Sequence, residues 1–166
     1  MKTFSYLLAT AALFSISCQK ELSELDQPAD KAVTFKKMLT NNDKTYRVAA
    51  FYSEVPIDYN PQDTITTLET DLWHHVLYYL KDDENIFREN GTLEVIQHDI
   101  TLPGDTTTVL YRQYSTENVE GAVIFNYLDH HYNPHPYYLH EKGNDYFIIY
   151  SIQGDVKLYS KFVEVK

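Results

Sequence analysis

The chain has little cysteine and no long apolar segment. Cys18 is the single cysteine among 166 residues, so an internal disulfide is excluded. The apolar run at residues 4–16 is about 13 residues long, whereas a membrane-spanning helix needs roughly 20. The sequence therefore predicts neither a disulfide-linked domain nor a membrane-spanning helix.

Basic side chains are also scarce. The chain has 14 Lys and Arg against 24 Asp and Glu, which gives a net charge of −10. A surface of this sign repels phosphate backbones and anionic lipid headgroups, since both are bound through Lys and Arg. We therefore expect no nucleic-acid partner.

The familiar catalytic motifs are absent from the sequence. It contains no Gly-x-Ser-x-Gly, no glycine-rich phosphate loop and no His-Glu-x-x-His, which are the signatures of several hydrolase and nucleotide-binding families. Carboxylates are plentiful, but a glycosidase pair is defined by its separation in space, so no pair stands out. We assign no catalytic residue and expect a protein that is not an enzyme.

The N-terminus has the three zones of an export signal. Lys2 is followed by the apolar run at 4–16, and small residues precede Cys18. A positive start, a short apolar centre and a small-residue cleavage site are typical of a secretory signal peptide. We predict a signal peptide over residues 1–17.

Residues 15–18, with the sequence Ser-Ile-Ser-Cys, resemble the lipobox of bacterial lipoproteins. The resemblance implies cleavage before Cys18, lipid on that cysteine and anchoring to the outer membrane, on its periplasmic or its cell-surface side. The following Lys20-Glu21 resembles the signal that sends Bacteroidetes lipoproteins to the cell surface. Residues 18–29 are polar and carry no apolar period, so we expect a lipidated tether before a single domain at 30–166.

Two helices are predicted from apolar periodicity. The first begins at Asp30 and ends at residues 41–42. The second spans 67–81, where a capping box at 66–69 precedes leucines at helical spacing. On this helix His74 and His75 would point about 100° apart, so they could not easily hold one ion. Asp71 and His75 would form a surface pair at i, i+4.

The rest of the chain has the alternation and turn residues of antiparallel strands. We predict strands at 45–53, 85–88, 92–98, 106–114, 122–128, 146–152 and 156–165. Asn90-Gly91, Glu120-Gly121 and 153–155 are predicted turns. This content favours a mainly β fold, either an antiparallel barrel or a strongly curved sheet, with one or two short helices.

The order of these elements resembles the lipocalin-like domain of small Bacteroidetes lipoproteins. In that family a first strand leads through a loop and a short helix to an acidic patch, a Phe-containing strand, a Gly turn and its partner strand. Residues 82–93, Asp-Asp-Glu-Asn-Ile-Phe-Arg-Glu-Asn-Gly-Thr-Leu, stand where that pattern falls. Residues 156–159 resemble its final strand. The resemblance covers residues 45–98 and 145–166 and implies a lipocalin-like barrel.

One segment is rich in histidine. Residues 129–141 contain His130, His131, His135 and His140 beside carboxylates, and imidazole with carboxylate suits zinc, copper or nickel. Prolines 134 and 136 predict a loop or an edge strand, where not all four rings could converge. The segment is a candidate zinc site, and its alternative is a solvated aromatic loop. We expect no other cofactor.

The chain has 15 tyrosines. Tyrosine joins an apolar ring to a polar tip, which suits both ligand and protein contacts. We take Tyr111, Tyr127, Tyr137 and Tyr138 as candidate ligand contacts; the alternative is that they fill the β core. The sequence thus predicts an exported, lipid-anchored module that binds a small apolar or glycan ligand. The alternatives are an accessory subunit of an outer-membrane complex and metal binding at 130–140.

Overall fold

The computed structural model describes residues 30–59, 67–76, 80–98, 109–129 and 131–166. The predicted signal peptide and the tether with Cys18 lie outside these residues. Residues Lys31–Lys166 form one compact unit, which holds all the elements below. Among the described residues, no helix combines the length and apolar character needed to cross a bilayer.

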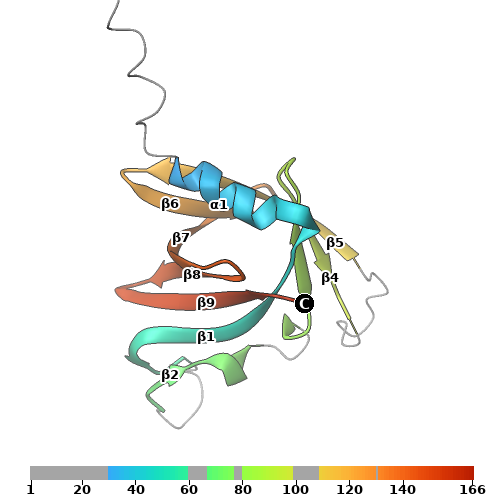
Figure 1. Ribbon diagram of the computed structural model, residues 1–166. Helices are drawn as coiled ribbons and strands as arrows, with labels where there is room; N and C mark the ends of the chain where they lie inside the picture. The colour runs from blue at the N-terminus through green and yellow to red at the C-terminus, as the bar shows by residue number, and fades with distance from the viewer. Residues whose placement is uncertain (1–29, 60–66, 77–79, 99–108, 130) are drawn as a thin grey trace, which may run out of the picture. The chain divides into compact units, whose positions relative to one another are not determined.

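The unit is a closed antiparallel β-barrel. Neighbours along the order β1-β3-β4-β5-β6-β7-β8-β9 are hydrogen-bonded, and β1 also pairs with β9, so these eight strands close on themselves. Figure 1 shows their arrangement, with β2 added alongside β1. The strands are β1 (Thr45–Ile57), β2 (Glu69–Asp71), β3 (Glu84–Phe87), β4 (Thr92–Ile96), β5 (Val109–Val119), β6 (Ala122–Leu128), β7 (Pro134–Lys142), β8 (Tyr146–Gln153) and β9 (Val156–Glu164). The predicted lipocalin-like barrel is confirmed.

Strand β1 closes the barrel because it is long and irregular. It has 13 residues and pairs with β3 through its first residues and with β2 through its later ones. It also pairs with β9 from Tyr46 to Ser53. A bulge between Val48 and Ala50 shifts the register against β9. Bulges bend a strand and increase its twist, which helps a sheet of this size to close.

Two of the predicted turns depend on backbone conformations that favour glycine. At the β5–β6 hairpin, Glu120 and Gly121 both have positive φ, 51° and 85°, as a two-residue type I′ turn requires. At the β3–β4 hairpin, Gly91 has φ 88°. A Cβ on Gly91 would lie 3.1 Å from the Tyr114 carbonyl oxygen. The Gly91 position is therefore restricted both by its φ and by its neighbour.

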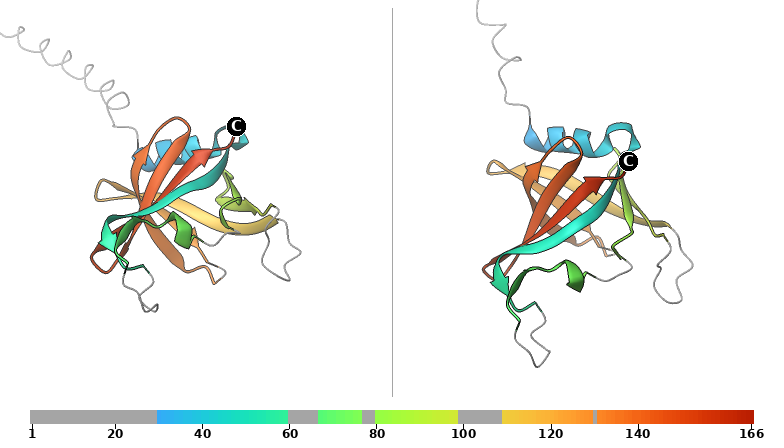
Figure 2. Two further views of the ribbon diagram at one scale, coloured as in Figure 1. Left: turned by 90° about the horizontal axis from the view of Figure 1, so that it is seen from below. Right: turned by 60° about the horizontal axis from the view of Figure 1, so that its bottom comes forward.

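Helix α1 (Lys31–Thr40) lies across one end of the barrel, while β2 and the short helix η2 (Trp73–His75) lie toward the other end (Figures 1 and 2). Helix α1 confirms the first predicted helix. A 3-10 turn, η1 (Asn41–Asp43), follows it, and Asn42 within that turn has φ 54°. Phe35 and Leu39 project from α1 and are fully buried, so the helix closes this end with its apolar face.

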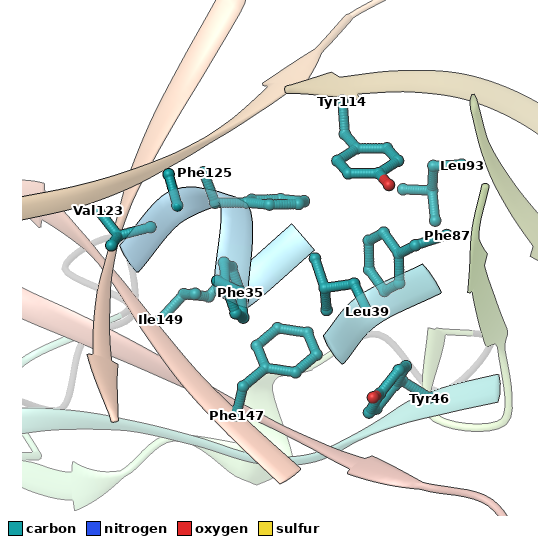
Figure 3. Close-up of a cluster of buried hydrophobic side chains, with 11 residues drawn as sticks. Phe35, Leu39, Tyr46, Phe87, Leu93, Tyr114, Val123, Phe125, Phe147 and Ile149 are labelled. Carbon is teal, nitrogen blue, oxygen red and sulfur yellow. The ribbon is translucent and has the colours of Figure 1, made fainter. Parts of the chain in front are cut away.

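The core beneath α1 is largely aromatic (Figure 3). Phe147 is fully buried, and its ring packs edge-on against Phe35 and Tyr46 and stacks on Phe162 with centroids 4.7 Å apart. The Tyr46 hydroxyl donates a hydrogen bond to the Met38 carbonyl, 3.3 Å away. This bond lets a tyrosine be fully buried without leaving its polar tip unsatisfied.

The predicted helix at 67–81 is wrong for the residues that the structure describes. Residues Glu69–Asp71 pair with β1 as a strand, and Trp73–His75 form only a 3-10 turn; residues 77–79 lie outside the described residues. Leu72 is fully buried, but Leu68 is 65% exposed, so the leucines do not share one buried face. Pairing along β1 satisfies the backbone here and outweighs the helical pattern.

Strand β7 was predicted as a loop or edge strand and is only partly so. Its first residues, which include Pro134 and Pro136, pair with β6. The pairing with β8 begins at Tyr138. Both prolines therefore lie where the described β7 has a partner on one side only, a position that tolerates a missing N–H. Beyond Tyr138 the strand pairs with β8. Because β7 lies between β6 and β8 in the closed barrel, it is not an edge strand, which corrects the prediction.

Candidate ligand-binding site

A cavity of about 420 Å³ opens inside the barrel. Part of its lining consists of core residues, and part lies one or two inward positions farther along the same strands, as Val48 does after Tyr46 and Tyr127 does after Phe125. Four of the described residues belong to both the core and the cavity: Phe87, Leu93, Phe125 and Ile149. The apolar wall consists of Val48, Leu80, Phe87, Leu93, Val95, Leu110, Phe125, Ile149 and Phe162. The core thus forms the floor of the cavity.

The polar residues of the cavity are Asp83, Asn85, Gln97, Arg112, Tyr127, Tyr137 and Ser160. Asp83 and Gln97 are each only 5% exposed. Within the part of the chain that the structure describes, Asp83 Oδ1 and Gln97 Oε1 have no hydrogen-bond partner. A buried acceptor without a donor costs about 1–3 kcal/mol. Two of the side chains that line the cavity thus each have one buried oxygen for which the described residues supply no donor.

Three of the other polar side chains of the cavity are paired. Arg112 Nε donates to the Tyr127 hydroxyl at 3.0 Å. Asn85 Nδ2 donates to the Tyr46 carbonyl at 3.3 Å. These bonds hold the polar side chains in fixed positions along the apolar wall, as expected for groups that orient a ligand.

Burial and, to a smaller extent, the neighbouring carboxylate of Asp82 raise the pKa of Asp83 from 3.8 to about 6, while His98 opposes the change. Asp83 is therefore mostly ionised at pH 7 and mostly neutral at pH 5. Burial also raises the pKa of Tyr137, with a smaller contribution from Tyr127. Tyr137 thus remains a neutral hydroxyl across the physiological range.

The structure separates the tyrosines that the sequence suggested. Tyr127 and Tyr137 line the cavity. Tyr111 is 66% exposed, and Tyr138 stacks on Tyr150 at 5.2 Å, in a cross-strand pair on the outer face of the barrel. In a strand, successive side chains alternate between faces, so neighbouring Tyr137 and Tyr138 point to opposite sides.

Sequence reasoning missed Asp83, Gln97 and Arg112. A signal for two of them was present. Gln97 continues the inward series of Leu93 and Val95, in which successive members are two residues apart. Arg112 stands at an inward position between Leu110 and Tyr114. A polar residue at an inward-facing position of an otherwise apolar strand face indicates that the barrel encloses a cavity at that level.

The histidine segment is organised by Asp129. Its carboxylate accepts hydrogen bonds from the backbone N–H groups of Asn133 and His131, at 2.9 and 2.8 Å. These bonds hold the pKa of Asp129 well below its usual range. Asp129 Oδ2 also lies 3.3 Å from His135 Nε2. The Asp129 carboxylate thus stabilises the turn that leads into β7.

The described histidines of this segment occupy different places. His140 packs edge-on against the Tyr159 ring, 5.0 Å away, and stands five positions beyond His135 on β7, which corresponds to about 16 Å of extended strand. His130 lies outside the described residues. Among the residues that are described, the group of three potential ligands that converges is Glu69, His74 and His75. Metal binding at 130–140 stays a prediction.

A scan against protein-family models gives no match for this chain, and a comparison with curated proteins gives no significant match either. The resemblance to small lipoproteins with lipocalin-like domains therefore stays a prediction as a statement of family. The barrel itself is a property of the structure.

Proposed function

We propose that the protein is a non-enzymatic binding module that holds a small molecule in the mouth of its barrel. The observation that carries this proposal is the cavity of about 420 Å³ with an apolar wall and two buried acceptors, Asp83 Oδ1 and Gln97 Oε1. Sites for small molecules generally have volumes of about 300–1,000 Å³, mostly apolar walls and a few fixed polar groups.

The lining indicates the chemistry of the ligand. Most of the wall is aliphatic or aromatic, so the body of the ligand should be apolar. Asp83 and Gln97 line the cavity with a carboxyl and an amide group. Both groups can accept hydrogen bonds, so the ligand should carry hydroxyl or amine donors. These features favour an amphipathic molecule over an extended glycan, whose many hydroxyl groups would need more polar partners than this wall provides.

We also propose that the module is tethered to the cell envelope by lipid on Cys18. The support is the export signal at residues 1–17 and the Ser-Ile-Ser-Cys sequence at its end. Labelling cells with a fatty-acid analogue should mark the wild-type protein and leave Cys18→Ser unmarked. Equal labelling of the two proteins would contradict lipidation at this residue.

The binding proposal can be tested with 1-aminoanthracene, an apolar fluorescent probe that carries one amine donor. We expect its fluorescence to rise on binding, with a dissociation constant on the order of micromolar. Val95→Trp should abolish binding, because Val95 lines the cavity. Val119→Trp is the matched control, since Val119 lies at the end of β5 and is 41% exposed.

Gln97→Leu tests the polar part of the site without adding volume. Removing one acceptor from a ligand amine should weaken binding by about tenfold, which corresponds to about 1.4 kcal/mol. Circular dichroism would establish that each variant is folded. Equal affinity of the wild type, Val95→Trp and Gln97→Leu for the probe would refute the cavity as the binding site.

The natural ligand can be sought by native mass spectrometry of the protein purified from its source. A reproducible mass excess over the denatured protein, retained by Val119→Trp and lost in Val95→Trp, would identify what the cavity carries. A mass excess that persists in Val95→Trp would place the bound molecule elsewhere.

A second candidate function is protein contact through the outer surface. Tyr111 and Tyr132 are 66% and 69% exposed, and both border a surface depression of about 520 Å³ beside Gln113 and Asp129. Exposed tyrosines are frequent anchors of protein interfaces. If this surface binds an envelope protein, Tyr111→Ala and Tyr132→Ala should reduce the cross-linked complex in membranes, while Val95→Trp should leave it unchanged.

A further inference from the structure

A second group of polar side chains converges outside the barrel cavity. Glu69 begins β2, and His74 and His75 belong to η2. One ligand atom from each of these residues lies within 4.8 Å of the others. The Nε2 atoms of His75 and His74 approach the same oxygen, Glu69 Oε1, at 2.5 and 3.3 Å. The imidazole centroids are 4.1 Å apart, so both rings face one carboxylate.

The backbone around this group holds the three side chains together. Glu69 is paired with Ile57 of β1. The fully buried Leu72 donates its N–H to the Phe51 carbonyl at 2.9 Å. The chain then reverses, and the His75 N–H donates to the Leu72 carbonyl at 3.0 Å. This reversal returns both imidazoles over Glu69, which explains why two adjacent histidines can converge although a regular helix would separate them.

Neighbouring side chains fix the two ends of the turn. Asp71 Oδ1 accepts a hydrogen bond from the Trp73 N–H at 3.0 Å, at the start of η2. The Tyr59 ring packs against His75 with centroids 5.1 Å apart. These contacts orient the imidazole of His75, and such outer contacts commonly position metal ligands.

We propose that Glu69, His74 and His75 bind a divalent transition-metal ion of the zinc class. Two neutral imidazoles and one carboxylate are a common ligand set for zinc. With metal–ligand bonds of about 2.0–2.1 Å, tetrahedral ligand atoms lie about 3.4 Å apart. The 3.3 Å separation of His74 Nε2 and Glu69 Oε1 is already close to this value. The 2.5 Å separation at His75 would have to widen by about 1 Å, through side-chain rotation.

The exposure of the group fits a surface ion with water in its remaining position. The side chains of Glu69 and His75 are 22% and 23% exposed, and that of His74 is 60% exposed. An open fourth position filled by solvent is usual when the protein supplies three ligands. The net charge of −10 also favours cations near the surface. This inference is independent of the ligand in the barrel.

The test is a calorimetric titration of the purified, chelator-treated protein with zinc chloride. We expect one ion per chain with a dissociation constant below about 100 µM. His74→Ala, His75→Ala and Glu69→Gln should each weaken binding by at least about tenfold, since each removes one of three ligands. His135→Ala is the matched control, because it removes a histidine that also faces a carboxylate, Asp129, at 3.3 Å.

Cobalt provides a second measurement on the same variants, because its visible spectrum reports imidazole and carboxylate coordination. Since His74 is mostly exposed, His74→Ala leaves the fold intact and separates metal loss from unfolding. The proposal is overturned by zinc binding weaker than about 100 µM, by equal binding in the wild type and His74→Ala, or by loss of binding in His135→Ala alone.

Discussion

Asp83→Asn should change the way in which the stability of the protein depends on pH. Asp83 is 5% exposed, and its pKa is raised from 3.8 to about 6, chiefly by burial. Between these two values the folded state keeps a proton that the unfolded state has released. The free energy of unfolding therefore falls as pH rises through this window, because the folded state binds more protons than the unfolded one. The amide that Asp83→Asn introduces cannot titrate, so the variant lacks this contribution.

The magnitude follows from the two pKa values. An interval from 3.8 to about 6 at about 1.36 kcal/mol per pH unit corresponds to about 3 kcal/mol. At pH 4 the unfolded carboxyl, with a pKa of 3.8, is already more than half ionised. The stability of Asp83→Asn relative to the wild type should therefore rise by about 2.4 kcal/mol between pH 4 and pH 7. Any fixed effect of the amide adds the same offset at every pH. Carboxylates that do not interact with Asp83 contribute equally to both proteins and cancel in the difference.

Urea denaturation of both proteins at pH 4, 5, 6 and 7 measures this difference, with circular dichroism as the probe of folding. Asp82→Asn supplies a second check on the cause. Because the Asp82 carboxylate raises the pKa of Asp83, Asp82→Asn should lower that pKa. The pH range over which stability falls should then end at a lower pH. A stability difference between Asp83→Asn and wild type that stays constant from pH 4 to 7, or falls as pH rises, would refute the reasoning.

Three further predictions concern the core and the turns. Phe147→Ala should lower the free energy of unfolding by about 3–5 kcal/mol, because the fully buried ring packs against four other aromatic rings. Chemical denaturation measures this loss, and a value below about 1 kcal/mol would contradict the packing. In the same assay, Gly91→Ala should lower the free energy of unfolding more than Gly121→Ala. Both glycines have positive φ, but only a Cβ at Gly91 would meet a backbone oxygen, at 3.1 Å. Equal losses of stability in the two variants would argue against that contact. In an ultraviolet titration, Tyr46 and Tyr114 should ionise only near pH 12, because burial raises the pKa of each to about 12. Tyr46→Phe should remove one of the tyrosines that ionise at this high pH. Full ionisation of all tyrosines by pH 11 would contradict their burial.

Local patterns predicted most of the barrel. The alternation at residues 122–128 gave β6 with its bounds, and the glycine turns at 91 and 121 placed two hairpins. These elements are predictable because alternation and positive φ are properties of short segments. The predicted helix at 67–81 failed for a different reason. Its leucine spacing fits a helix, but the long β1 offers an open edge that pairs with Glu69–Asp71, and this long-range pairing is invisible in a window of the sequence.

The candidate sites were less accessible to sequence reasoning than the fold. Tyr127 and Tyr137 were named in advance and line the cavity, whereas Tyr111 and Tyr138 were named equally and lie outside it. All four have the same chemistry, and only the phase of each strand in the closed barrel distinguishes them. The group of Glu69, His74 and His75 was obscured because the predicted helix sends the adjacent rings apart.

The sequence by itself determined the absence of an internal disulfide, the acidic charge, the expected export signal and the β-rich order of elements. These follow from composition and from short-range backbone preferences, which each segment carries alone. The closure of β1 on β9, the cavity around Asp83 and the convergence of two histidines on Glu69 were decided only by the tertiary structure. Each of these features joins segments from separate elements, and their proximity depends on strand register and barrel closure, which no local pattern contains.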